Sequence, residues 1–328
     1  MSDPLAGAVP LPAAEEEAHH ISTALSLEQL DTNLFRSKDL WTPAWARGVF
    51  GGQVISQALL AATNSVNPKY AAHSLHCYFL LAAKASVPII YTVDRVREGR
   101  TYATRAVRAV QNGHTVFVLM CSFQIPEIAQ PAAYRVMPSN IVPPDECELL
   151  EDLFARLAEA LPTGTRHHAK LVDYAKDRRQ SPIAIKPAQK IATLTGFSDP
   201  AAPMWWMKAR NLPKLDAQYQ KCILAYLSDL QFISTTIRML NASTEGEDYR
   251  ASMTSSLDHS IWFYGDDFDC GEWLLYAMQS PRVGFGRGVV HGQIFTQKGV
   301  LVAVTTQEGV ARVYLPDEAG GLAHRSKL

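Results

Sequence analysis

The sequence lacks the features that would direct it to a nucleic acid, a membrane or an oxidising compartment. Lysine and arginine total 31 against 32 for aspartate and glutamate, so there is no global basic field to hold a nucleic acid. No apolar run approaches the roughly 18 residues that span a bilayer. The five cysteines are scattered and free of CxxC spacing, which favours reduced thiols and argues against a zinc site. We therefore expect a globular protein inside the cell, with no nucleic acid, no membrane span, no metal and no cofactor.

Several enzyme signatures are also missing. There is no GxSxG nucleophile elbow and no phosphate-binding Walker loop. The glycine-rich run Gly284–Gly288 lacks the GxGxxG spacing of dinucleotide-binding loops. His73 and His76 are three residues apart, which on a strand would place them on opposite faces, so a metal pair is not expected. A core or hydrogen-bonding role is the better interpretation of these histidines.

The two ends of the chain carry different signals. The N-terminus has no basic region followed by an apolar one, so no signal peptide is predicted, and residues 1–20 are expected to be a disordered lead-in. The chain finishes Ser326-Lys327-Leu328, the tripeptide read as a peroxisomal import address. Residues 317–328 are expected to form a flexible tail that presents this signal to the import receptor, which predicts a location in the peroxisomal matrix.

One stretch of the sequence organises the rest because it occurs twice. The run Ser256–Phe263 (SLDHSIWF) is related to His73–Leu80 (HSLHCYFL) in the first half of the chain. Both runs have a histidine at the fourth position, His76 and His259, and aromatic residues follow it. We treat the two histidines as equivalent positions of a duplicated unit.

Each copy has a helical pattern before the shared run and a hairpin turn after it. The turns, Asn112-Gly113 and Lys298-Gly299, lie 37 and 40 residues beyond the two histidines. This near-equal spacing supports a duplication. The chain is therefore predicted to hold an N-terminal module over residues 21–125 and a C-terminal module over 181–316, joined by a linker with a helix over 126–180.

The first module is predicted to be a helix followed by antiparallel strands. Leu25–Leu40 is expected to be a short helix and loop. The pair Gly51-Gly52 then opens a segment with helical spacing. These glycines favour either close approach of a ligand to the helix N-terminal amides or plain packing. Four strands are predicted to follow: 74–80, 88–96, 101–110 and 115–123.

The linker and the second module repeat the order of elements. Asp145 is expected to cap a leucine-rich helix in the linker, and the basic stretch Arg166–Arg179 is interpreted as a solvated surface. Asp216 precedes one long helical pattern, Tyr219–Leu240. A polar run, Gln307–Gly309, is expected to end the last apolar strand. A helix wrapped by antiparallel strands, twice in tandem, predicts an α+β double hot-dog fold with two central helices against one long sheet.

Six ordered motifs carry a family resemblance. They are Phe50-Gly51-Gly52-Gln53, Tyr78-Phe79-Leu80, Tyr226-Leu227-Ser228-Asp229, Leu257-Asp258-His259-Ser260, Glu272-Trp273-Leu274-Leu275-Tyr276 and Gln307-Glu308-Gly309-Val310. Together they resemble the type II acyl-CoA thioesterases, and the match runs from about residue 25 to 313 with a divergent middle over 125–200. The resemblance implies hydrolysis of medium- to long-chain fatty acyl-CoA in peroxisomal fatty-acid metabolism, by a chain that forms homo-oligomers. One departure is Leu81–Ala85, where the family has an Arg-Pro-Gly-Asp type of turn.

The resemblance also implies the site residues. In the family, an aspartate, a threonine or serine, and a glutamine position a water, and the matching residues here are Asp229, Ser256 and Gln307. Taken singly, each could serve a structural purpose at the end of a helix or strand. A carboxylate can accept a proton from water while an amide and a hydroxyl orient that water, so no covalent serine is required. With His76 aligned to His259, the first module has His73 in place of Ser256, so we expect one active site per chain.

Two other functions remain open at this point. Hydratases and dehydratases acting on enoyl- or hydroxyacyl-CoA share the fold, but their Asp-x-Asn-Pro-x-His loop does not occur here. A non-catalytic acyl-CoA binding protein is the other alternative, and only the intact polar residues argue against it. Release of the free CoA thiol would separate these functions.

Overall fold

The computed structural model describes residues 20–127, 129–132, 136–189, 191–193, 196–197, 202–243 and 251–314. Most of the predicted lead-in, residues 1–19, lies outside the described residues, and so do the predicted tail and its import tripeptide. None of the helices in the described ranges combines the length and the apolarity of a membrane-spanning segment.

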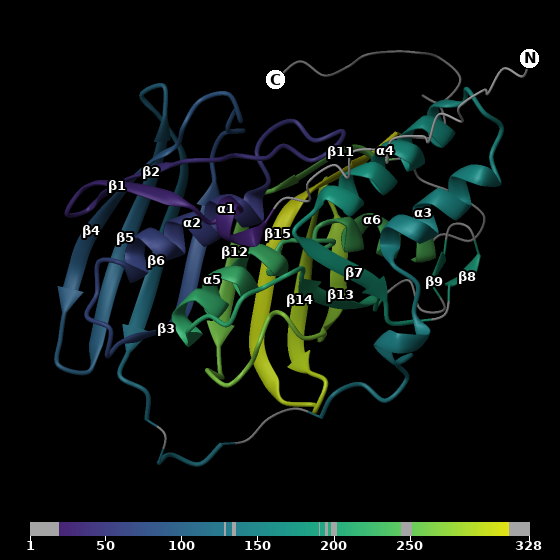
Figure 1. The fold of residues 1–328 in the computed structure, drawn as a ribbon. Coiled ribbons are helices and arrows are strands. Elements are labelled where there is room, and N and C mark those ends of the chain that lie inside the picture. The colour runs from purple at the N-terminus through teal and green to yellow at the C-terminus, as the bar shows by residue number, and fades with distance from the viewer. Residues whose placement is uncertain are drawn as a thin grey trace, which may run out of the picture.

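Two central helices, α2 (Gly51–Thr63) and α5 (Ala217–Ser228), pack against each other and against one long antiparallel sheet (Figure 1). Thirteen of the described strands form this sheet, and strands of the first half occupy one side of it while strands of the second half occupy the other. In spatial order they are β1 (Leu27–Asp31), β2 (Leu34–Ser37), β4 (Ile90–Glu98), β5 (Tyr102–Gln111), β6 (His114–Gln124), β3 (Ala71–Phe79), β12 (Asp258–Phe263), β15 (Leu301–Val313), β14 (Arg287–Thr296), β13 (Leu274–Gly284), β10 (Met204–Ala209) and β7 (Ile183–Pro187), with β11 (Ala251–Ser256) also paired to β15. The predicted double hot-dog fold is confirmed.

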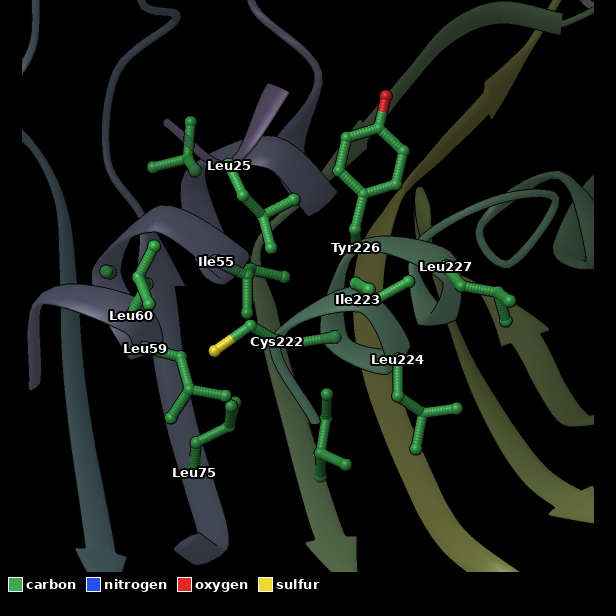
Figure 2. Close-up of a cluster of buried hydrophobic side chains, with 14 of the residues drawn as sticks. Leu25, Ile55, Leu59, Leu60, Leu75, Cys222, Ile223, Leu224, Tyr226 and Leu227 are labelled. Carbon is green, nitrogen blue, oxygen red and sulfur yellow. The ribbon is translucent and has the colours of Figure 1, made fainter. Parts of the chain in front are cut away.

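The core lies between the helices and the sheet. Small residues along α2, including Ala58, Ala61 and Ala62, are fully buried, so the sheet approaches the helix closely. Figure 2 shows Ile55 and Leu59 of α2 beside Cys222 of α5, in the layer where the two helices meet. All five cysteines are free thiols.

The duplication is visible in matching irregularities of the two hairpins. Gly113 and Gly299 both have positive φ, at 79° and 82°, which suits a residue without a Cβ. In each hairpin the strand register shifts three residues beyond the glycine, at Val116 and at Val302. Because both the turn and the irregularity recur at the same offset, residues can be aligned between the modules by their distance from the turn glycine.

This alignment corrects the predicted equivalence of the two histidines. Met120 and Thr306 each lie seven residues beyond the turn glycine, and their partners on the central strands are His76 and Ser260. His76 is therefore equivalent to Ser260, and aligning it with His259 was wrong by one residue. Since side chains alternate along a strand, the error exchanges the two faces of the sheet: His259 is fully buried, whereas His76 is exposed.

The equivalent residues His76 and Ser260 also pair with each other where β3 and β12 join the two halves of the sheet. The Nδ1 atom of His76 lies 2.9 Å from the Ser260 hydroxyl. The pseudo-two-fold axis of the duplicated fold thus passes through this pair.

The segment predicted as a short helix and loop over Leu25–Leu40 is mainly a β-hairpin. A single helical turn, α1 (Ile21–Ala24), precedes it, and β1 and β2 follow. Phe35 and Ser37 are buried on alternate positions of β2, and the Ser37 hydroxyl accepts a hydrogen bond from the Ile89 amide. The prediction failed because this two-residue alternation is too short to be separated from a helical pattern.

The predicted long helix Tyr219–Leu240 is two helices. Asp216 caps α5, its Oδ1 accepting from the Tyr219 amide at 3.1 Å, and the helix ends with Asp229 as its C-cap. After a break in which Gln231 has a φ of 62°, α6 (Ser234–Ser243) begins.

The predicted end of the last strand at Gln307–Gly309 was also wrong, because β15 continues to Val313 through pairing with β11 and β14.

The linker region contains two helices rather than one. A 3-10 turn (Pro144–Glu146) precedes α3 (Leu150–Glu159) and α4 (Arg166–Gln180), which pack against each other. Asp145 lies in the 3-10 turn, and the N-cap of α3 is Leu149, so the predicted cap is wrong. The short strands β8 (Ile191–Thr193) and β9 (Gly196–Phe197) form a separate hairpin.

Candidate active site

The structure brings Asp229, Ser256 and Gln307 together, although they lie far apart in the sequence. The Gln307 amide nitrogen Nε2 donates to Asp229 Oδ1 at 3.0 Å and to the Ser256 hydroxyl at 2.6 Å. These three residues, the polar trio, come from the C-terminus of α5, the last residue of β11 and the middle of β15. Because the hydroxyl accepts from Gln307, its own proton is available for a further acceptor such as a water.

The carboxylate of Asp229 lies against the N-terminus of α2, which belongs to the other half of the chain. The Gly52 amide acts on Asp229 as a hydrogen-bond donor. A Cβ added to Gly51 would lie 2.7 Å from Asp229 Oδ2, so only glycine leaves room for the carboxylate there. The site therefore forms between the two modules, with the positive end of the α2 dipole facing the carboxylate.

The two glycines at the start of α2 have different reasons for being glycine. A Cβ on Gly52 would meet the Tyr226 carbonyl oxygen at 2.4 Å and the ring of Phe50 at 2.5 Å. Phe50 and Tyr226 themselves stack edge to face, with ring centroids 4.9 Å apart. Gly52 thus satisfies the packing interpretation, whereas Gly51 permits close approach of the carboxylate.

Burial tunes Asp229 for proton transfer near neutral pH. Burial raises the pKa of Asp229 from 3.8 to about 7, and hydrogen bonds from Gln307 and the Gly52 amide oppose the rise. Three neighbours respond to its charge, Cys77, Tyr226 and Tyr276, and burial raises the pKa of each. They stay neutral around pH 7, so Asp229 is the group of this set that titrates there.

Ser228 and His259 extend the site and were missed in the sequence. The Ser228 hydroxyl lies 3.0 Å from His259 Nε2 and 2.9 Å from the Ala225 carbonyl oxygen. Burial lowers the pKa of His259 to about 3, and a hydrogen bond with the Gln307 side chain opposes the drop. Both residues stand inside the motifs that carry the family resemblance, and this position was the available signal.

The first module has no matching trio. Cys121 is equivalent to Gln307, because each lies eight residues beyond its turn glycine. Ala72 is equivalent to Ser256 by strand register, and Asn64 is equivalent to Asp229 because each is the C-cap of its central helix. A fully buried arginine, Arg105, is the register partner of Cys121 and donates to the Ser65 hydroxyl at 2.8 Å. This end of α2 is thus stabilised by a structural arginine, which agrees with one site per chain.

The loop that departs from the family pattern is anchored next to the start of α2. The Ala83 carbonyl accepts from the Val49 amide at 2.9 Å. The side chain of Gln111 bonds to both the amide and the carbonyl of Lys84, at 2.8 Å each. Leu81–Ala85 is therefore fixed beside the segment that leads into Gly51.

The structure also corrects the argument about His73 and His76. The strand register shifts between Ala72 and Ser74, so the two-residue alternation does not extend to His73 and the prediction of opposite faces does not apply. The His73 ring instead packs edge to face with Tyr102, at 5.8 Å between centroids. Within the described residues there is no group of three or more potential metal ligands.

Comparisons with known proteins identify the family of the chain. Residues 39–124 match the model of the acyl-CoA thioesterase N-terminal domain, and residues 155–311 match that of the C-terminal domain. The chain is 35% identical to human acyl-coenzyme A thioesterase 8 over 300 residues, 89% of each chain. It is 35% identical to acyl-CoA thioesterase 2 of Haemophilus influenzae, covering 88% of this chain and 95% of that protein. The yeast (Saccharomyces cerevisiae) peroxisomal acyl-coenzyme A thioester hydrolase 1 is 25% identical, over 90% and 95% of the two chains.

Solved structures show the same architecture. A crystal structure of an acyl-CoA thioesterase II from Mycobacterium marinum superposes with a TM-score of 0.68 at 32% identity, covering 90% of this chain and 98% of that one. A hot-dog protein of unknown function from Alicyclobacillus acidocaldarius has a TM-score of 0.67 at 18% identity, over 90% and 99%, and supports the fold alone. The chain belongs to the acyl-CoA thioesterase II family and is an acyl-CoA thioester hydrolase.

Proposed function

We propose that this thioester hydrolase cleaves medium- to long-chain fatty acyl-CoA in the peroxisomal matrix, using a water held by the polar trio. The observation that carries the proposal is the Gln307 amide, which joins a buried carboxylate of raised pKa to a hydroxyl. A carboxylate with a pKa near the operating pH is suited to general-base catalysis. Amide and hydroxyl together fix the geometry in which a water attacks.

The proposed reaction is a direct hydrolysis. Asp229 takes one proton from the water while the water oxygen forms a bond to the thioester carbonyl carbon, and the carbonyl π electrons move to oxygen. Collapse of this intermediate breaks the carbon–sulfur bond and releases the CoA thiolate, which then takes up a proton. A thiol with a pKa of about 8.5, by analogy with cysteine, leaves without strong acid assistance. Activation of the water is therefore the step that the trio serves.

The developing oxyanion needs hydrogen-bond donors, and the N-terminus of α2 borders Asp229. Gly51 lies directly against Asp229 Oδ2, so the first turn of this helix borders the place where the water would attack. Backbone amides at a helix N-terminus stabilise negative charge on an oxygen without reorganisation. We assign the oxyanion to this end of α2.

Thiol release measured over a series of acyl-CoA chain lengths tests the function. The expected result is stoichiometric free CoA and fatty acid, with kcat/KM highest for medium to long chains, the substrate class that the family resemblance implies. A preference for acetyl-CoA would contradict the proposed substrate class. Addition of water to an enoyl-CoA without thiol release would instead favour the hydratase alternative, and binding without any product would favour the non-catalytic one.

The C-terminal tripeptide and the name of the yeast relative support the peroxisomal location. We expect deletion of Ser326–Leu328 to abolish import while leaving the thioesterase activity of the purified protein unchanged. Import of a fluorescent fusion, with and without the tripeptide, measures this. Retained import would show a second signal and would contradict recognition by the import receptor through the tail alone.

The family resemblance also implies a homo-oligomer, and we include this in the proposal. Light scattering measures the mass of the assembly.

A further inference from the structure

A cavity of about 670 Å³ lies at the β7 edge of the sheet, and the residues that line it do not include the polar trio. One wall comes from the end of the linker and the start of α3, and the other from β7, β10 and the loop before β13. Helix α3 packs against β7 at this edge (Figure 1). The volume is that of a site for a small organic molecule.

The cavity and the trio lie on opposite faces of the sheet. Side chains alternate along β13, so Leu275 points away from the face that Tyr276 occupies. Tyr276 is on the side of α5, because its hydroxyl donates to the Ser228 carbonyl at 2.8 Å. Leu275 and Trp273 instead belong to a separate apolar cluster with Cys147 of the linker. Trp273 and Cys147 also line the cavity, so the cavity belongs to the outer face of the sheet.

Two lysines of the cavity converge on one aromatic ring. The Nζ atoms of Lys186 and Lys208 lie 5.0 and 4.9 Å from the centroid of the Trp273 ring, so they are less than 10 Å apart. Lys186 also donates to the Pro144 carbonyl at 2.7 Å. The ring attracts each ammonium group, but it carries no net charge, so the two groups still repel each other.

The other charged side chains of the lining already have ion-pair partners. These pairs are Glu148–Arg156 at 2.5 Å, Asp152–Arg179 at 3.6 Å and Arg210–Glu151 at 2.5 Å. In the part of the chain that the structure describes, neither Lys186 nor Lys208 forms an ion pair with a carboxylate. The half-buried lining therefore holds two positive charges that no negative charge compensates.

We propose that this cavity binds a phosphate monoester, with the phosphate between Lys186 and Lys208. Such a group carries close to two negative charges at pH 7, which match the two unpaired lysines. Lysine binds phosphate as a point charge, whereas planar carboxylates are better matched by arginine. A phosphate fills only part of the cavity, so the remaining volume takes the organic part of the ligand. This site is separate from the thioesterase site and does not depend on the mechanism proposed there.

Titration calorimetry of the full chain with phenyl phosphate tests the site. We expect binding at millimolar concentration or below, at least tenfold weaker binding by Lys208→Gln, and little change in Lys208→Arg, which keeps the charge. Tenfold is the scale of one hydrogen bond to a charged group. Lys69→Gln is the matched control, because Lys69 also lies over an aromatic ring, that of Tyr70 at 5.1 Å, but outside the cavity. Thermal unfolding checks that the variants fold, and Lys186→Gln removes the second lysine in a separate variant.

Cys147 supplies a readout inside the cavity, since the other four cysteines are buried. Phenyl phosphate should slow the labelling of Cys147 by a maleimide in the wild type and leave it unchanged in Lys208→Gln. The KM for acyl-CoA should be the same in both proteins. Absence of phenyl phosphate binding, equal binding by the wild type and both glutamine variants, or equally tight binding of succinate would overturn the inference. A tenfold rise in KM would make the cavity part of the substrate site and would overturn it as well.

Discussion

Replacing Asp229 with asparagine is expected to lower kcat for acyl-CoA hydrolysis by about 100-fold or more, the scale for losing a general base. Asparagine keeps the shape of the side chain and an oxygen that accepts from Gln307 or the Gly52 amide, but it cannot take a proton from water. Acyl-CoA binding should be nearly unchanged, since the substrate does not need the negative charge. The measurement is thiol release at saturating substrate, and a folded variant with near-wild-type turnover would remove Asp229 from the mechanism.

The pH profile gives this prediction a second test. Only ionised Asp229 acts as a base, and burial raises its pKa to about 7, so wild-type kcat/KM should fall as the pH drops through about 7. This acidic limb should disappear in Asp229→Asn, whose residual rate follows hydroxide alone. An identical limb in both proteins would assign the titration to another group.

Thermal stability provides the folding control for Asp229→Asn, because the contribution of Asp229 to the free energy of unfolding depends on pH. Because the folded pKa of Asp229 lies above the value of 3.8, the folded chain binds this proton more tightly than the unfolded chain does. The contribution of Asp229 to stability therefore declines as the pH rises from about 4 to about 7. At pH 8 Asp229→Asn should unfold at a temperature no lower than the wild type. A large loss of stability would mean that the missing activity reflects misfolding.

The second large effect concerns Gln307 and Ser256. Gln307→Ala should lower kcat about 100-fold, the scale for losing one preorganised amide donor, because this amide holds both other members of the trio. Once it is gone, Ser256→Ala should cost little more, since groups that orient one shared water act as a unit. The measurement is a double-mutant cycle on kcat with binding of acyl-CoA followed separately.

Ser256→Thr is the matched control for this cycle. Threonine keeps the hydroxyl that accepts from Gln307 Nε2, so Ser256→Thr should retain much of the activity. Strictly additive losses in the cycle, or losses confined to binding, would mean separate roles for Ser256 and Gln307. The shared water would then have to be abandoned.

The sequence predicted the architecture better than it predicted the register, and the three residues that it singled out lie in contact with one another. Asp229 and Gln307 were identified through ordered motifs, and the fold through the repeated order of helix and strands. His76 and His259 were aligned by their place in similar runs, but sheet register depends on strand irregularities such as the shift near Val116, which leave no residue signature. A one-residue error was enough to exchange the two faces of the sheet.

The break after α5 shows the same limit in a helix. The residues from Tyr219 to Leu240 keep helical spacing across the interruption, so periodicity alone predicts one helix. The chain turns at Gln231 with a positive φ, and this turn leaves Asp229 at the end of α5 rather than on its side. Likewise, the partnership of Asp229 with Gly51 joins residues 178 positions apart, which only the packing of α2 against α5 brings together.

The meeting of Asp229 with the start of α2 has a consequence for how the duplicated gene could diverge. The second module carries the three polar side chains and the first module carries the glycines against which Asp229 lies, so the two modules are complementary and are not interchangeable. A dimer of two C-terminal modules would have two sets of the polar side chains but no Gly51-Gly52 pair beside them. A dimer of two N-terminal modules would have the glycine pairs but no polar trio. A single polypeptide that holds one module of each kind keeps their ratio at one to one, so every chain contains one complete site.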